Sequence, residues 1–118
     1  METIKSYTDI EQSKVLAKIL PHESADMVYT MINGYHTPFI RIETIQEMDK
    51  DDVCAWSLAA LLNVLPDGTN LIKEKSDTEN EHYMCTVGTK GGIISTFGKN
   101  PVDACVAMIE KLHKLKIL

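Results

Sequence analysis

The sequence predicts an α+β fold in which a small antiparallel sheet of three to five strands packs against about three helices. Two observations carry this prediction. Apolar residues recur at helical spacing in separate segments, and each segment has start or stop signals beside it. Short β-favouring runs bounded by turn residues lie between those segments. The 118 residues are 44% hydrophobic, which suits a single domain covering residues 1–118.

The first helix is expected over residues 9–20. Thr8 and Glu11 have the spacing of a capping box, in which each side chain accepts a hydrogen bond from the other's backbone. Apolar residues cluster at helical spacing through the segment, and Pro21 prevents its continuation. The helix should therefore be amphipathic and lie at the surface.

Two β-favouring runs follow, at residues 27–31 and 39–45. Asn33-Gly34 lies between them and is typical of a tight turn, because both residues tolerate positive φ. In the second run Ile40 and Ile42 alternate with charged residues, which indicates a half-buried strand.

An apolar run over residues 53–65 is expected to form the central helix. Acidic residues precede it and Pro66-Asp67-Gly68 follows it, so both ends carry helix-boundary signals. It is apolar almost all round, so it should be the most buried helix, with Trp56 anchoring the core from its first turns. At about thirteen residues the run is shorter than the ~20 needed to cross a bilayer, and we expect no membrane span.

The C-terminal part carries the clearest signals. Residues 82–87 and 93–97 are β-rich runs joined by a glycine-bearing loop, which predicts an antiparallel hairpin. Asn100 as the cap and Pro101 at the first helical position begin a helix that should reach about Lys114.

The core should lie where these elements meet. We expect the hairpin and one or two earlier strands to form the sheet, covered on one face by the helices around Trp56 and Cys105. Replacing Leu62 or Ile109 by alanine should then open a cavity and cost about 2–5 kcal/mol.

The sequence contains no recognisable catalytic or metal-binding constellation. Cys54, Cys85 and Cys105 lie far apart, whereas structural zinc sites usually use paired cysteines. Such an odd, scattered set favours a reducing compartment, so we expect a cytoplasmic protein. Gly98-Lys99 precedes a helix but lacks the rest of a phosphate-binding loop. We expect no catalytic residue, metal or cofactor. The leading hypothesis is therefore a non-enzymatic accessory protein that acts by binding a protein or a small ligand, and an enzyme of unknown type is the third.

The formal net charge of −5 argues against binding to nucleic acids or anionic membranes. Lys111, Lys114 and Lys116 are the only dense basic group, and their position suits stabilisation of the end of a helix. A nucleic-acid-binding or regulatory domain remains the alternative function, because strands beside a lysine-bearing helix can present a basic edge.

Two groups of residues are candidates for binding a partner protein or a small ligand. The first consists of aromatic residues that flank the first turn, and aromatic side chains near loops often form recognition surfaces. The second is the glycine-rich turn of the C-terminal hairpin. The candidate residues are Tyr29, Tyr35, His36 and Phe39 in the first group and Thr89, Lys90, Gly91 and Gly92 in the second.

Four segments carry a resemblance to other proteins: Asp9-Ile10-Glu11-Gln12-Ser13-Lys14, Glu23-Ser24-Ala25-Asp26-Met27, Ala55-Trp56-Ser57-Leu58-Ala59-Ala60-Leu61-Leu62 through Pro66, and Asn100-Pro101-Val102-Asp103-Ala104-Cys105 to Leu112-His113. This text resembles a group of small uncharacterised proteins of phages, prophages and mobile elements of gut Bacteroidales. The resemblance implies one continuous fold and a genetic setting in which accessory proteins modulate host machinery or counter host defence. It implies no activity.

The β-rich runs also suggest self-association. Residues 93–97 contain neither charge nor proline, and residues 83–87 are similarly undefended. Edge strands without such protection recruit other strands. If either run lies at an edge, we expect a homo-oligomer, most simply a homodimer.

Overall fold

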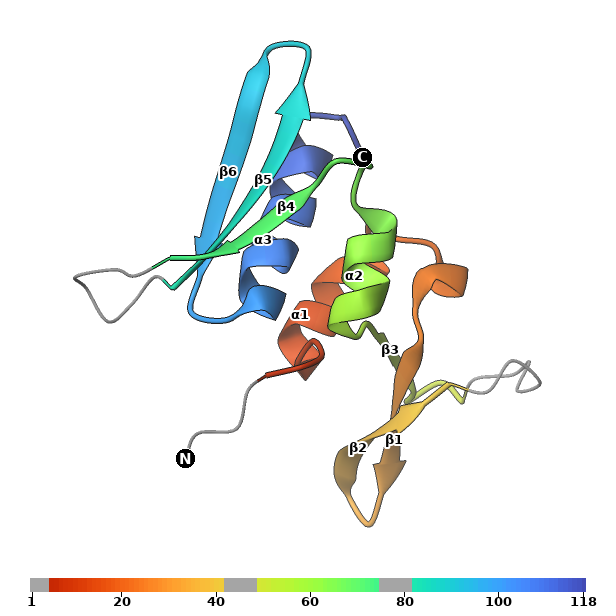
Figure 1. Cartoon of the computed structure of the whole chain (residues 1–118). Helices are drawn as coiled ribbons and strands as arrows, with labels where there is room; N and C mark the ends of the chain where they lie inside the picture. Colours follow the sequence, from red (N-terminus) through yellow and green to blue (C-terminus); the bar gives the residue numbers. More distant parts are fainter. Residues whose placement is uncertain (1–4, 42–48, 75–81) are drawn as a thin grey trace.

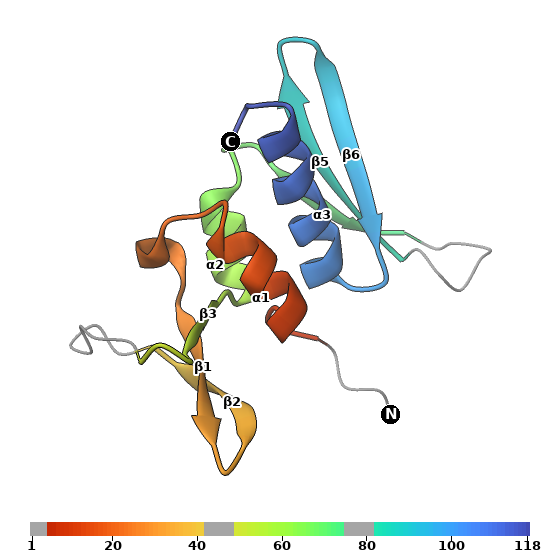
Figure 2. The same cartoon turned by 180° about the vertical axis from the view of Figure 1, so that it is seen from behind.

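The computed structural model describes residues 5–41, 49–74 and 82–118. Within them it has three α-helices, one short 3-10 helix and two three-stranded antiparallel sheets. The α+β prediction is confirmed, with the strands divided between two sheets. The helices lie between the two sheets, whose hairpins extend in opposite directions (Figures 1 and 2).

The N-terminal sheet contains β1 (Met27–Ile32), β2 (Tyr35–Ile40) and β3 (Val53–Ala55) in the order β2-β1-β3. The tight turn at Asn33-Gly34 is confirmed, since both residues have positive φ, 50° and 83°. β2 begins four residues earlier than predicted, and the end of the predicted run, at residues 42–45, lies outside the described residues.

The predicted cap of the first helix is wrong by one residue. α1 covers Ile10–Ala17, and Asp9 is its N-cap: the Asp9 carboxylate accepts from the Gln12 backbone N–H at 2.8 Å, and the Gln12 side chain accepts from Asp9 N–H. Thr8 is instead fully buried, and its hydroxyl lies 2.8 Å from that of Ser13. Thr8 therefore belongs to the core, because it has partners elsewhere in the chain. The short 3-10 helix η1 (His22–Ser24) follows.

The predicted central helix is wrong in its first part. Residues 53–55 form β3, which pairs with β1, and α2 covers only Leu58–Val64. The backbone of Trp56 exchanges N–H···O bonds with Thr8: Thr8 N–H donates to Trp56 O at 2.9 Å, and Trp56 N–H donates to the Thr8 hydroxyl at 3.1 Å. These bonds hold the chain extended until Ser57, which caps α2.

Two core predictions have different outcomes. Trp56 is fully buried as expected, although it lies between β3 and α2 instead of in a helix. Ile109 is fully buried, but Leu62 is 39% exposed and its neighbour Leu61 is the buried residue. The prediction for Leu62 is wrong because the shorter helix presents Leu61 to the core.

The C-terminal sheet has the order β4-β5-β6, with β4 at Asn70–Lys73, β5 at Tyr83–Thr89 and β6 at Gly92–Gly98. α3 (Pro101–Lys114) packs across one face of it. The hairpin, the Asn100 cap and the helix are all confirmed. Gly98 is required where β6 turns into α3, because a Cβ there would lie 2.5 Å from the Ala104 nitrogen.

Candidate binding surface

The four predicted aromatic-group residues do not form one surface. Tyr29 is buried, and its hydroxyl donates to the Thr8 carbonyl at 2.7 Å. Tyr35 and Phe39 share one face of the β1–β2 hairpin, because they are four residues apart in β2 and alternate residues of a strand share a face. His36 faces the other side, opposite Met31. Tyr35 and Phe39 therefore remain candidates, whereas Tyr29 is a core residue.

The predicted turn Thr89–Gly92 lies at the far end of the molecule from that hairpin (Figures 1 and 2). The Thr89 hydroxyl donates to the Gly92 carbonyl at 2.8 Å and accepts from Gly91 N–H at 3.2 Å, so it closes the turn. Beside it lies an open pocket of about 690 Å³ whose other walls are Val87, Ile117 and Pro66. The turn thus contributes backbone and the Lys90 side chain to a mainly apolar hollow.

The two faces of the β4-β5-β6 sheet differ sharply. The inner face presents Cys85 and Val87, both buried, to α3. The outer face is not covered by any described helix or strand (Figure 1). We call this outer face the open face. The strand alternation and register assign it the following residues: Asn70, Ile72, Met84, Thr86, Gly88, Ile93, Ser95 and Phe97.

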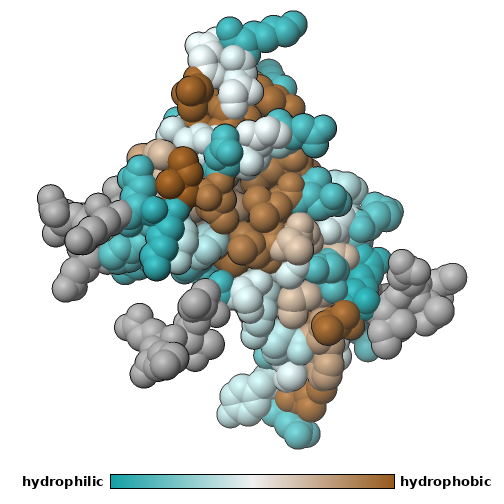
Figure 3. All heavy atoms as spheres, in the orientation of Figure 1, coloured by the Kyte–Doolittle hydropathy of each residue, from teal (hydrophilic) through white to brown (hydrophobic). Residues whose placement is uncertain are grey.

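The residues assigned to the open face are uncharged, and an apolar row lies there beside the polar row of Asn70, Thr86 and Ser95. Ile72, Met84 and Phe97 are register partners across the three strands, so they form one continuous row. Ile93 stands further along β6 and is 77% exposed. Hydrophobic residues gather over this sheet and the adjoining α2 in Figure 3. One-sided antiparallel sheets normally turn polar side chains to water, so an exposed apolar row on the outer face indicates an interaction surface.

The sequence reasoning missed this row. In residues 93–97 Ile93 and Phe97 lie on one face and Ile94 on the other, and neither face carries a charge. A strand with large apolar residues on both faces is the signal that could have identified it. The sequence does predict that residues 83–87 and 93–97 lack the charges and prolines that protect an edge strand. The structure places β6 at an edge of the sheet and β5 at its centre.

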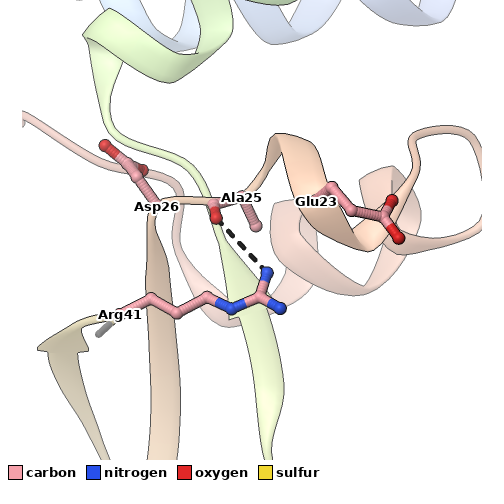
Figure 4. A pocket seen from close by; sticks show the side chains of 4 residues that line it. All are labelled: Glu23, Ala25, Asp26 and Arg41. Carbon is pink, nitrogen blue, oxygen red and sulfur yellow. Dashed lines mark hydrogen bonds between the residues drawn. The ribbon is translucent and has the colours of Figure 1, made fainter. Parts of the chain in front are cut away.

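A second pocket, of about 390 Å³, is lined by Glu23, Ala25, Asp26 and Arg41 (Figure 4). The Arg41 guanidinium donates to the carbonyls of His22 and Ala25. The Asp26 carboxylate points away from it and accepts from the backbone N–H and hydroxyl of Ser57. These charged groups hold η1, β2 and α2 together, so the fold itself already uses them.

All three cysteine side chains are buried. The hydrogen-bonding contact with Cys105 lowers the pKa of Cys85. Cys85 and Cys105 are fully buried between β5 and α3, and the contact with Cys85 together with burial raises the pKa of Cys105. Burial also raises the pKa of Cys54. Over residues 5–41, 49–74 and 82–118, no cluster of three or more His, Cys, Asp or Glu side chains could hold a metal ion. The same residues include no helix long and apolar enough to span a bilayer.

Comparison with known proteins adds no assignment. No family model matches the chain, and neither a curated protein nor a solved structure is significantly similar to it.

Proposed function

We propose that this chain is a non-enzymatic binding protein that recognises another protein through the open face. The observation that carries the proposal is the uncharged row of Ile72, Met84 and Phe97 across the outer side of the C-terminal sheet. Protein interfaces have an apolar, charge-depleted centre with a polar rim. His82 and Glu74, register neighbours at one end of the sheet, supply such a rim.

The polar groups of the N-terminal half support the same conclusion. Asp26, Arg41 and Tyr29 each bond to the chain's own backbone, so they serve its folding. The resemblance to proteins of phages and mobile elements suggests that the partner belongs to the host cell. The chain would then act as an accessory protein that modulates host machinery.

Capture from a Bacteroidales lysate, followed by direct titration with the purified partner, tests this function. Phe97→Asp places a charge in the apolar row of the open face and should weaken binding at least about tenfold, because an unpaired charge would be buried. Ile40→Asp is the matched control, since Ile40 is 79% exposed on the other sheet. If Ile40→Asp abolishes binding and Phe97→Asp does not, the β1–β2 hairpin is the interface and the proposal is wrong.

A small apolar ligand in the pocket beside the turn Thr89–Gly92 is the second candidate. The pocket favours it, because Val87, Pro66 and Ile117 give apolar walls and Lys90 is a charged residue among those that line it. Native mass spectrometry of the freshly purified protein should then show an added mass that Val87→Asn removes. A spectrum with the bare chain mass alone excludes a co-purifying ligand.

A further inference from the structure

The hydrogen-bonding edge of β6 that faces away from β5 is the longest strand edge left unpaired in the described residues. β6 has seven residues, pairs with β5 on one side and has no described element on the other (Figures 1 and 2). Thr96 fixes it from within, because its hydroxyl donates to the Ala104 carbonyl of α3 at 2.8 Å. The edge is therefore held in a strand conformation before anything binds to it.

The register shows which backbone groups face outward. His82, just before β5, bonds to both neighbouring strands, because its carbonyl accepts from Glu74 N–H at 2.7 Å and its N–H donates to Gly98 O at 3.2 Å. Within β5 the two-residue turn Lys90-Gly91 closes on the pair Thr89–Gly92, which is hydrogen-bonded in such hairpins, so even-numbered residues of β5 direct their backbone groups to β4. Odd-numbered residues of β5 then direct theirs to β6, where they meet residues 94 and 96. The backbone N–H and C=O groups of Ile93, Ser95 and Phe97 consequently point to the free side. None of the three is proline, so all three can donate.

β5, the turn after it and β6 contain no acidic residue. From residue 82 to residue 99 the only Lys, Arg, Asp or Glu residues are Lys90 and Lys99, in a chain with 17 acidic residues. Lys90 lies in the turn, two residues before β6 begins, and Lys99 directly follows β6; both are exposed. In the described structure neither makes an ion pair. The free edge is thus an uncharged strand with a cation at each end.

Two occupants compete for such an edge, and the lysines discriminate between them. A second copy in antiparallel pairing would bring its own Lys90 beside Lys99 at both ends of the junction, and like charges there oppose association. An extended segment with acidic residues at its ends would meet both cations. It would also extend the open face with its own alternate side chains.

We propose that β6 binds an extended, acidic-ended segment of a partner protein as a fourth strand of the β4-β5-β6 sheet. This inference rests on the proposed function and names the kind of partner segment that would pair at the edge of the sheet, beside the open face. Strand addition gives affinity through main-chain hydrogen bonds, and the ends of the segment determine which sequence is accepted.

Fluorescence anisotropy with a labelled nine-residue peptide tests the inference. The probe alternates valine and threonine and has an aspartate at each end. It should bind the wild-type chain, while a version methylated at alternate backbone nitrogens should not. The double variant Lys90→Glu, Lys99→Glu should bind the probe about 2- to 30-fold more weakly, because two exposed ion pairs are lost, and should prefer a lysine-ended version.

Three outcomes would overturn the inference: no binding at millimolar probe, equal binding of the methylated peptide, or a dimer in light scattering that Ser95→Pro converts to monomer. The last would show that a second copy occupies the edge. If the probe fails while Phe97→Asp still abolishes partner capture, only strand addition is wrong and the proposed function stands.

Discussion

The two sheets of this protein are anchored in different ways. Near β3, the N-terminal sheet is covered on both faces, with Tyr29 buried on one and Cys54 on the other. Long-range polar bonds fix it, such as that from the Tyr29 hydroxyl to Thr8. The C-terminal sheet is held by apolar packing of one face on α3. Because one-sided packing suffices for folding, its other face is available to a partner.

The prediction with the largest expected effect tests the apolar packing of the C-terminal sheet on α3. Ile109 is fully buried in α3, so Ile109→Ala should lower the free energy of unfolding by about 2–5 kcal/mol through cavity formation. Chemical denaturation measures the change. Leu62→Ala is the control in α2 and should cost less than about 1 kcal/mol, since Leu62 is partly exposed. Equal losses at the two positions would show that the core does not lie beneath α3.

The second prediction tests the long-range hydrogen bonds that fix the N-terminal sheet. Thr8→Val keeps the shape of the side chain but removes the hydroxyl that accepts from Trp56 N–H and contacts Ser13. Leaving these buried groups unpaired should cost about 1–3 kcal/mol, measured by denaturant unfolding. Thr69→Val is the surface comparison, because the hydroxyl of Thr69 bonds only to the nearby Pro66 carbonyl. A Thr8→Val variant as stable as the wild type would show that these hydrogen bonds do not stabilise the N-terminal sheet, and the contrast with the C-terminal sheet would be wrong.

The same difference explains what the sequence could predict. In the C-terminal half the determinants are local: Asn100 caps the helix that it precedes, and turn residues separate paired strands. In the N-terminal half, residues 53–56 have a helical pattern but are extended, because Thr8 supplies hydrogen-bond partners 48 residues away. No local signal reports such a partner. The open face was missed for a related reason, since the strand register that aligns Ile72 with Phe97 is a tertiary property.

A smaller effect is expected where the two halves meet at the starts of α1 and α3. The Asp103 carboxylate accepts from Lys5 Nζ at 2.9 Å, Gln12 Nε2 at 2.8 Å and Asn100 Nδ2 at 3.0 Å. Partial burial acts to raise the pKa of Asp103, but the bonds from Lys5 and Gln12 hold it below its usual value. Asp103→Asn should lower the free energy of unfolding by about 1 kcal/mol near neutral pH.

The pH dependence of that contact follows from the sign of the shift. The lowered pKa of Asp103 means that its contribution is complete above the ordinary value of 3.8 and is lost as the pH falls through the folded-state pKa. Burial opposes the charge on Lys5, but hydrogen bonds to Asp103 and Asp9 raise its pKa, so its contribution is lost only as the pH rises past 10.5. Urea titrations at several pH values should show the Asp103→Asn difference shrinking at low pH. A difference that grows on acidification would contradict the assigned contact.

The smallest effect provides the sharpest comparison, because the chain contains a matched pair of residues for it. Ile93 and Ile94 are adjacent in β6 and identical in type, but Ile93 stands on the open face while Ile94 packs against the core. Ile94→Thr should cost about 1–3 kcal/mol, since it replaces buried apolar surface with a hydroxyl. Ile93→Thr should change stability by no more than about 0.5 kcal/mol, because its side chain is already in water and threonine keeps the β-branch. A folded protein gains little from that exposed isoleucine, so its presence is better explained by association. If Ile93→Thr destabilises the isolated chain as much as Ile94→Thr, the open face is needed for folding and is not a vacant interface.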